Sequence, residues 1–328
     1  MLLGGDYPVM SAQIYLAIIG MYDIPQGSAL AVILLIPAVL MFFAHKHLSA
    51  KASFATVGAK GSSRHRLVTH RPTRIGALVF VGAVTLVICL QYATVLAGAT
   101  TELFGIDHTF TLKHFSAAFS KSGGALFDTF TLGILSSVLS VVLGLLIAYF
   151  VARSKKPGSA AMDFIANMPL AIPGTVIGLA FALAFNNPPI VMTGTAAIIV
   201  FAFTVRSLPY AIRSGVAAFG QLHRSMDEAS TTMGATAGQT LWRVLIPLVR
   251  PALLAGMVFA FTRSVTTLSA VIFVVSPHWS LVTPTILSQM DRGDVGQAAA
   301  LSVIVVIMVL FVIHVVPRFF GRDWRETH

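Results

Sequence analysis

Residues 225–251 read SMDEASTTMGATAGQTLWRVLIPLVRP, the longest block of this sequence that is neither a hydrophobic span nor a plain linker. Ser225 and Glu228 have the S-x-x-E spacing of a capping box, which predicts a helix that starts near Met226. Gly234 is placed to end this helix, because glycine takes the left-handed conformation at a helix C-terminus without a Cβ penalty. We refer to residues 225–251 as the elbow.

The second half of the elbow repeats these signals. Thr236 and Gln239 again have the spacing of a capping box, so a second helix is expected to begin there. It is expected to pass through Trp242 and to stop where Pro247 interrupts the backbone bonding. Pro251 then fits the first turn of the following span. On cap spacing alone, the elbow is equally consistent with an ordinary amphipathic loop between two membrane helices.

The composition is that of a membrane protein. Of the 328 residues, 56% are hydrophobic and only 10% are charged, with a mean hydropathy of +0.85, whereas soluble domains average roughly 25% charged residues. The single cysteine, Cys89, lies in an apolar run and cannot form an intrachain disulfide. A net charge of +10 is compatible with nucleic-acid binding, but no basic run is interleaved with aromatic residues. The expected partner is therefore a lipid bilayer and not nucleic acid.

Hydropathy predicts an all-α polytopic membrane protein with seven spans. These spans are residues 28–44, 75–98, 125–152, 163–185, 195–218, 252–275 and 297–316. Between the first two spans, residues 46–74 carry seven Lys and Arg and no acid, so the positive-inside rule makes this linker cytoplasmic. The resulting topology has the N-terminus outside and both the elbow and the C-terminus inside. It places 16 of the 22 Lys and Arg in the cytoplasm and three outside.

An internal repeat explains the odd number of spans. DIPQGSALAVI at 23–33 aligns with DVGQAAALSVI at 294–304, with six identities in eleven positions. Each segment opens a span that runs from outside to inside. The first span is therefore expected to be the last helix of a preceding, related half of a double-length protein. On this interpretation the chain is a fragment of a fusion, the product of a split gene or the product of a misplaced start. The expected domains are the end of that half (1–45), the basic linker (46–74) and a six-helix domain (75–328).

The order of residues in the elbow carries a family resemblance. Glu228-Ala229-Ser230, then Gly234, then Val244 and Ile246-Pro247 resemble the EAA loop of ABC-importer permeases. Ser230, Val244 and Ile246 depart from the usual alanine, isoleucine and leucine of that signature. The resemblance covers nearly the whole chain. In detail, the chain is similar to the fused, double-length permeases of the ferric-iron importer group. It also rests on residues 2–27, 269–277 and 293–300, while a first half with its own EAA loop is absent.

The resemblance implies a fold, a location and partners. The fold is the six-helix half of a type I ABC-importer permease in the bacterial inner membrane, with one extra N-terminal helix. The partners are ABC ATPase subunits, an external substrate-binding protein and a second permease half. The elbow would dock on the ATPase through Ser225, Asp227, Glu228, Ala229, Ser230, Gly234 and Pro247. Glu228 would cap its helix and offer a charge to the ATPase, although capping alone is the simpler alternative.

Arginines within the predicted spans are the second candidate site. A charge in a span is costly unless it snorkels, pairs or lines water, so Arg206 and Arg263 either pair with backbone carbonyls at the break that Pro209 makes or line the translocation path. Arg213 lies nearer the cytoplasmic end and is expected to snorkel. The polar run after Arg263 adds Ser264, Thr266 and Thr267 to the path. The alternative is interhelical hydrogen bonding among small polar side chains. Asn167, Pro169, Pro173 and Gly174 indicate an interrupted helix start, which is equally consistent with packing or with a gate.

The sequence contains no catalytic signature. It has no GxxxxGK[ST] loop, no HExxH and no paired cysteines, so we expect no enzyme activity, no catalytic residue, no cofactor and no metal site, and we expect ATP hydrolysis in a separate subunit. A secondary transporter would need intramembrane carboxylates, and the candidates Asp128 and Asp163 sit at span ends. A non-transporting fragment of a fused permease is the third alternative. Ferric iron is the first expected substrate, followed by 2-aminoethylphosphonate or another small anion.

Overall fold

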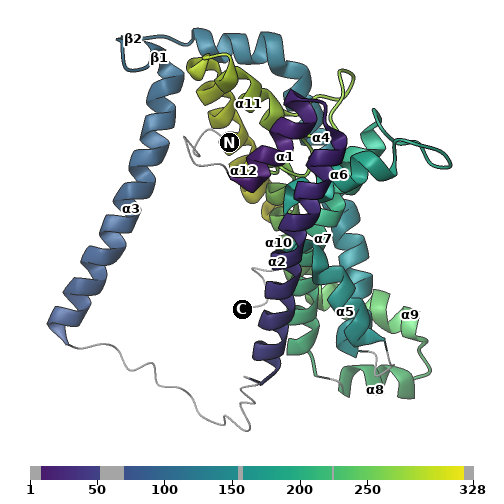
Figure 1. Cartoon of the computed structure of the whole chain (residues 1–328). Helices are drawn as coiled ribbons and strands as arrows, with labels where there is room; N and C mark the ends of the chain where they lie inside the picture. Colours follow the sequence, from purple (N-terminus) through teal and green to yellow (C-terminus); the bar gives the residue numbers. More distant parts are fainter. Residues whose placement is uncertain (1–8, 52–69, 154–157, 224, 321–328) are drawn as a thin grey trace.

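Long helices lying side by side make up most of the protein (Figure 1). The computed structural model describes residues 9–51, 70–153, 158–223 and 225–320. Six helices in these ranges are long and apolar enough to cross a membrane, and a seventh span results if one bent pair is counted as a single span. The all-α polytopic fold predicted from the sequence is thus confirmed.

The elements follow one another along the chain with few irregular segments. The long helices are α2 (Ile24–Lys51), α3 (Arg71–Thr100), α4 (Lys113–Arg153), α7 (Ala196–Gln221), α10 (Ile246–Val265) and α12 (Val295–Phe320). The shorter helices are α1 (Met10–Tyr15), α5 (Ser159–Asn167), α6 (Gly174–Ala184), α8 (Ser225–Thr232), α9 (Ala237–Thr240) and α11 (Val282–Asp291). The remaining elements are the π turns η1 (Leu16–Gly20) and η3 (Leu241–Leu245), the 3-10 turn η2 (Met168–Leu170) and the strands β1 (Thr101–Leu103) and β2 (Asp107–Phe110).

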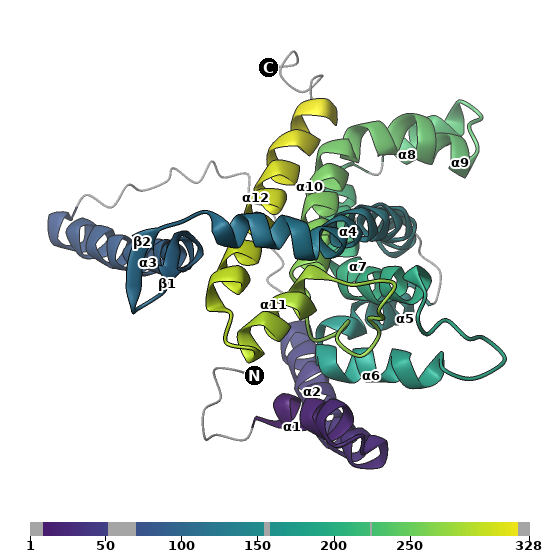
Figure 2. The same ribbon diagram turned by 90° about the horizontal axis from the view of Figure 1, so that it is seen from above.

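Helices α4, α7 and α10 form the centre of the bundle (Figure 2). Small residues let α4 and α7 approach closely, since a Cβ on Gly144 would lie only 2.7 Å from the Cβ of Ala211. Three phenylalanines on α7 and α10, Phe203, Phe219 and Phe261, are fully buried between these helices and their neighbours. The centre is therefore packed by side chains of this chain and does not rely on lipid.

Helix α3 stands apart from the bundle along most of its length (Figure 1). None of the residues in its most apolar stretch is buried inside the protein. Only its C-terminal end, with Gly98 and Ala99, is buried, close to Ala299 of α12. In a bilayer, lipid or another protein covers such an apolar surface. A helix can face lipid in this way because its backbone groups are hydrogen-bonded within the helix.

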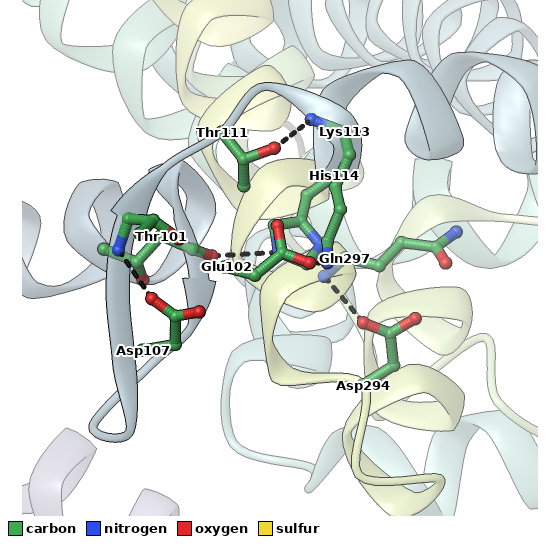
Figure 3. Close-up of polar contacts among 9 residues, drawn as sticks. Thr101, Glu102, Asp107, Thr111, Lys113, His114, Asp294 and Gln297 are labelled. Carbon is green, nitrogen blue, oxygen red and sulfur yellow. Dashed lines mark hydrogen bonds and ion pairs between the residues drawn. The ribbon is translucent and has the colours of Figure 1, made fainter.

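A small hairpin and its polar contacts connect α3 to the start of α4 (Figure 3). Strands β1 and β2 pair antiparallel. Nε2 of the buried His114 lies 3.0 Å from the carbonyl oxygen of Thr101, and the ammonium of Lys113 pairs with the carboxylate of Glu102. The segment 99–124, predicted to lie outside, thus contains a hairpin followed by the first turns of α4.

The two copies of the internal repeat begin their helices in the same way. The Oδ1 atom of Asp23 accepts a hydrogen bond from the backbone N–H of Gln26 at 2.9 Å, and Oδ1 of Asp294 accepts one from Gln297 at 3.0 Å. Figure 3 shows the second of these caps. A residue with positive φ precedes each aspartate, namely Tyr22 at 55° and glycine 293 at 78°.

The predicted span 163–185 is divided into two helices. Helices α5 and α6 meet at 102° across the turn η2. Pro169 and Pro173 account for the break, because each lacks a backbone donor and its ring clashes with the carbonyl four residues earlier. The interruption expected around Asn167 is thus confirmed, but it divides the span and does not merely mark its start.

The predicted span 252–275 is wrong at both ends. The helix runs without interruption from residue 237 to 265, so Pro247 does not stop it and Pro251 lies inside α10 and not at its first turn. The π turn explains this, since the N–H of Ile246 bonds to the carbonyl of Leu241, five residues earlier, and widens the helix just before the proline ring. The apolar run after residue 265 forms turns buried in the protein, and hydropathy does not separate these from a span.

Candidate functional site: the elbow and the arginine cavity

The first helix of the elbow ends in a Schellman motif. Gly234 has φ of +80°, and its N–H bonds to the carbonyl of Thr231 at 2.9 Å. The next N–H, of Ala235, reaches back to Ser230 at 3.1 Å. These are the two bonds that define this helix stop, so the predicted role of Gly234 is confirmed. Helix α8 itself begins at Ser225, one residue before the predicted start at Met226. The capping box predicted for Ser225 and Glu228 is wrong, because Ser225 already belongs to the helix and its hydroxyl makes no hydrogen bond to Glu228 in the described structure.

The second helix of the elbow has the predicted capping box. Oγ1 of Thr236 accepts from the N–H of Gln239 at 3.3 Å, while the Gln239 side chain accepts from the N–H of Thr236 at 2.9 Å. A further contact joins the two helices: the hydroxyls of Ser230 and Thr240 lie 2.8 Å apart, and both residues are buried. Ser230, the departure from the EAA signature, therefore braces the elbow internally.

Arg153 attaches the elbow to the end of α4. Its Nη1 lies 3.1 Å from Oδ2 of Asp227, and its Nη2 donates to the carbonyl of Leu222 at 3.1 Å. The arginine side chain is 7% exposed and that of Asp227 30% exposed. Sequence reasoning missed this residue, counting Arg153 only as one of the cytoplasmic positive charges. The basic last turn of α4 was visible in the sequence, but its partner lies 74 residues further along the chain.

The outer surface of the elbow exposes both charge and apolar area. Glu228, Ala229 and Pro247 are exposed. Met233 is 82% exposed and Trp242 68% exposed. Large exposed apolar side chains on a polar segment are typical of a surface that another protein covers.

The elbow continues directly into α10. Leu241, Leu245 and Val249 pack against Leu145 of α4 and Phe219 of α7. The helix then runs on to Val265, past the second candidate site. The elbow and the second candidate site are therefore joined by one continuous helix.

The second site is a cavity of about 320 Å³ beside the break between α5 and α6. It is lined by seven polar and two apolar side chains. Four of the five residues predicted to line a path meet there: Arg206, Arg263, Thr266 and Thr267. Ser269, which belongs to the same polar run after Arg263, also lines the cavity, and the two polar lining residues that sequence reasoning missed are Ser11 and Thr175.

Ser264, the fifth predicted path residue, lies outside the cavity lining. It is fully buried, and its hydroxyl is 2.9 Å from that of Ser207 and 3.2 Å from that of Ser136. Three hydroxyls from α4, α7 and α10 thus meet in the bundle centre. At this position the alternative of interhelical hydrogen bonding describes the structure.

Two arginines contact the broken span. Nη1 of Arg206 donates to the carbonyls of Pro169 and Ile172 at 2.9 and 3.1 Å, not to carbonyls near Pro209, as the sequence suggested. Nε of Arg213 donates to Oδ1 of Asn167 at 3.3 Å. The break therefore supplies the acceptors that a charged side chain within a membrane helix requires.

A multi-pass helical bundle with a capped, braced elbow and an internal polar cavity is the architecture of a membrane transport component. The chain belongs to the family of binding-protein-dependent transport system inner membrane components, whose profile matches residues 140–324. It is thus a multi-pass protein of the inner membrane.

The chain has sequence relatives among ferric, phosphonate and sulfate transport permeases. The chain is 33% identical over 321 residues to the ferric transport system permease protein FbpB of Actinobacillus pleuropneumoniae, covering 95% of this chain and 46% of the relative. It is 34% identical over 285 residues to a putative FbpB 1 of Haemophilus influenzae, covering 84% and 45%. The chain therefore spans about half the length of these relatives. A putative 2-aminoethylphosphonate permease, PhnV of Salmonella paratyphi A, is 24% identical over 71% of this chain and 89% of its own length.

Solved structures share the fold. The chain resembles a subunit of a bacterial ABC transporter involved in the import of the acidic polysaccharide alginate, with a TM-score of 0.60 and 16% identity. The match covers 76% of this chain and 96% of the other. At this identity, the likeness concerns the fold alone.

Proposed function

We propose that the chain is a permease subunit of an ATP-driven importer, and that the elbow receives force from a separate ATPase. The observation that carries this proposal is the bracing of the elbow: two capped helices joined by buried hydroxyls, tied to α4 by Arg153 and continuous with α10. A connector that frayed would absorb the displacement. The exposed Glu228, Met233 and Trp242 are the proposed contacts with the ATPase.

The proposed orientation has the N-terminus outside and the C-terminus and elbow in the cytoplasm. The charge bias of the loops supports it. Hydrolysis of ATP belongs to the partner, because the sequence has no phosphate-binding GxxxxGK[ST] loop.

We further propose that residues 1–45 close a preceding, related permease half. The matched aspartate caps of α2 and α12 support this, as does the length of the ferric permease relatives, about twice that of this chain. Residues 46–74 would be a cytoplasmic linker, of which 52–69 lie outside the described residues. The six-helix domain from 75 onward would pair with a second half.

Ferric iron is the proposed solute, delivered by an external binding protein. The relatives named as ferric permeases support this choice. A second candidate is 2-aminoethylphosphonate or another small anion, favoured by the phosphonate permease relative and by two arginines in the cavity.

Uptake in cells tests the proposal. The chain would be expressed together with a second permease half, an ABC ATPase and an external binding protein, and accumulation of radiolabelled ferric iron and of labelled 2-aminoethylphosphonate would be compared. We expect energy-dependent uptake of iron that disappears when the ATPase Walker lysine is replaced. Uptake that persists in that ATPase variant would indicate a secondary transporter, and no uptake of either solute would contradict the proposed function.

A further inference from the structure

We propose that the cavity between Arg206 and Arg263 is an oxyanion-binding site. The inference deepens the proposed function and rests on it only for the statement that the bound species is in transit. The ligand class is a small, multiply oxygenated anion, either free or as the outer oxygens of an anionic ferric chelate. A bare metal cation does not fit the site.

Charge is the first reason. Two guanidinium groups line the cavity, and none of its described lining residues is acidic. Arginine stays protonated at any physiological pH, so a metal cation entering here would meet two positive charges and no compensating carboxylate. Hard cations such as ferric iron prefer anionic oxygen ligands. A negatively charged solute, in contrast, is attracted by both arginines.

Unused donors are the second reason. The Nε atoms of Arg206 and Arg263 are buried and have no hydrogen-bond partner within the described part of the chain, and the same holds for Oγ1 of Thr175. Buried polar groups are nearly always paired. Three lone buried donors around one cavity indicate that its occupant supplies acceptors.

Rigidity is the third reason. Nη1 of Arg206 is held by two carbonyls of the broken span, those of Pro169 and Ile172. These two bonds fix the guanidinium of Arg206 in place without a carboxylate. Arg263 lies in the last turn of α10, which packs into the bundle centre through the buried Phe261 and Val265 on either side of Arg263. Planar guanidinium groups bind oxyanions with two parallel hydrogen bonds when they are fixed in this way.

Size and location fit a small solute. The volume of about 320 Å³ lies at the lower end of the roughly 300–1,000 Å³ typical of small-molecule sites. The hydroxyl of Ser11 adds a neutral polar group beside the arginines, whereas the hydroxyls of Thr266 and Thr267 donate to the carbonyls of Thr262 and Arg263. Because Ser11 comes from α1, the cavity lies between the N-terminal unit and the six-helix unit.

Equilibrium binding to the full-length chain in lipid nanodiscs tests the site. One arm uses radiolabelled inorganic phosphate, and the other uses iron-labelled ferric citrate with citrate alone as competitor. We expect saturable binding in at least one arm. Binding of phosphate, or displacement of ferric citrate by citrate alone, would assign the site to a free oxyanion. Binding of ferric citrate that citrate does not displace would assign it to the chelate.

Variants separate a built site from general attraction to a basic protein. Arg263→Gln is expected to weaken binding at least tenfold, while Arg263→Lys retains part of it. Arg213→Gln is the matched control, since it removes an arginine that lies outside the cavity lining, and it should bind as the parent does. Thermal unfolding of each variant verifies folding. Thr175→Val, with a smaller expected loss of binding, removes the unpartnered hydroxyl of the same cavity without a charge change.

Two outcomes would overturn the proposal: no saturable binding of either probe by the folded parent, or equal binding by the parent and Arg263→Gln. The measurement involves no ATPase. Binding that survives while ATP-driven uptake fails would therefore reject the proposed function and leave the anion site standing.

Discussion

Nη1 of Arg153, the last residue of α4, lies 3.1 Å from Oδ2 of Asp227 in the first helix of the elbow. The pair joins two helices that are 74 residues apart in sequence, and it places a largely buried guanidinium beneath the elbow. The elbow is therefore connected to α4 by this ion pair, in addition to the backbone that continues into α10. Force applied to the elbow is expected to reach both helices.

Asp227→Asn is expected to loosen the elbow. The substitution leaves Arg153 buried without its counter-charge, and we expect a loss of about 1–3 kcal/mol in unfolding free energy, because Asp227 itself is partly exposed. Thermal unfolding of the purified chain measures this. Glu228→Gln, on the exposed side of the same helix, serves as the control and should leave stability unchanged while weakening ATPase binding. Equal destabilisation by both variants would contradict the role assigned to the ion pair.

Gly234→Ala is expected to impair coupling more than folding. At φ of +80° a Cβ costs about 1–2 kcal/mol, and that strain is relieved by unwinding the end of α8. ATP hydrolysis by the assembled complex should lose its response to loaded binding protein. The control is Gly238→Ala, in a helix with open space around the added methyl group. If Gly238→Ala uncouples as strongly as Gly234→Ala, the left-handed turn is not the cause.

Ser230 and Thr240 are expected to be energetically coupled. Their hydroxyls form one buried hydrogen bond, so each single replacement, Ser230→Ala or Thr240→Val, leaves one buried hydroxyl without its partner. A double-mutant cycle on thermal stability should give a coupling of about 1 kcal/mol. Thr232→Ala is the control, because it removes an exposed hydroxyl of the same helix that bonds only to the carbonyl of Glu228 within that helix. Additive losses in the cycle would show that the two elbow helices are not braced through this contact.

Local features were predictable from the sequence and contacts between distant segments were not. The caps at Gly234 and Thr236 depend on residues a few positions apart, so spacing was sufficient to predict them. The pairs Arg153–Asp227 and Ser230–Thr240 depend on how helices pack, which no spacing rule encodes. The end of α10 was misplaced for a related reason: the apolar residues 270–275 are buried by protein, and a hydropathy profile does not distinguish protein from lipid.

The cavity was likewise predictable from the sequence only in part. The cost of a charge within a span was enough to single out Arg206 and Arg263. This cost alone did not reveal that carbonyls of the broken span hold Arg206. Nor did it reveal that Ser11, nearly 200 residues before Arg206 in the sequence, lines the same cavity. Ser264 shares the polar run of Thr266 and Thr267 but faces Ser136 and Ser207, because only helix packing decides which side of α10 meets the cavity.

The central claim is that the elbow lies in the cytoplasm, where an ATPase can reach it, and labelling of single cysteines tests this most directly. With Cys89 replaced by Ala, Ala237→Cys places a thiol on the elbow, and Ile106→Cys places one on the β hairpin, where the native side chain is 79% exposed. A membrane-impermeant maleimide should label position 237 only in inverted vesicles and position 106 in intact cells. Labelling of position 237 in intact cells would contradict the account.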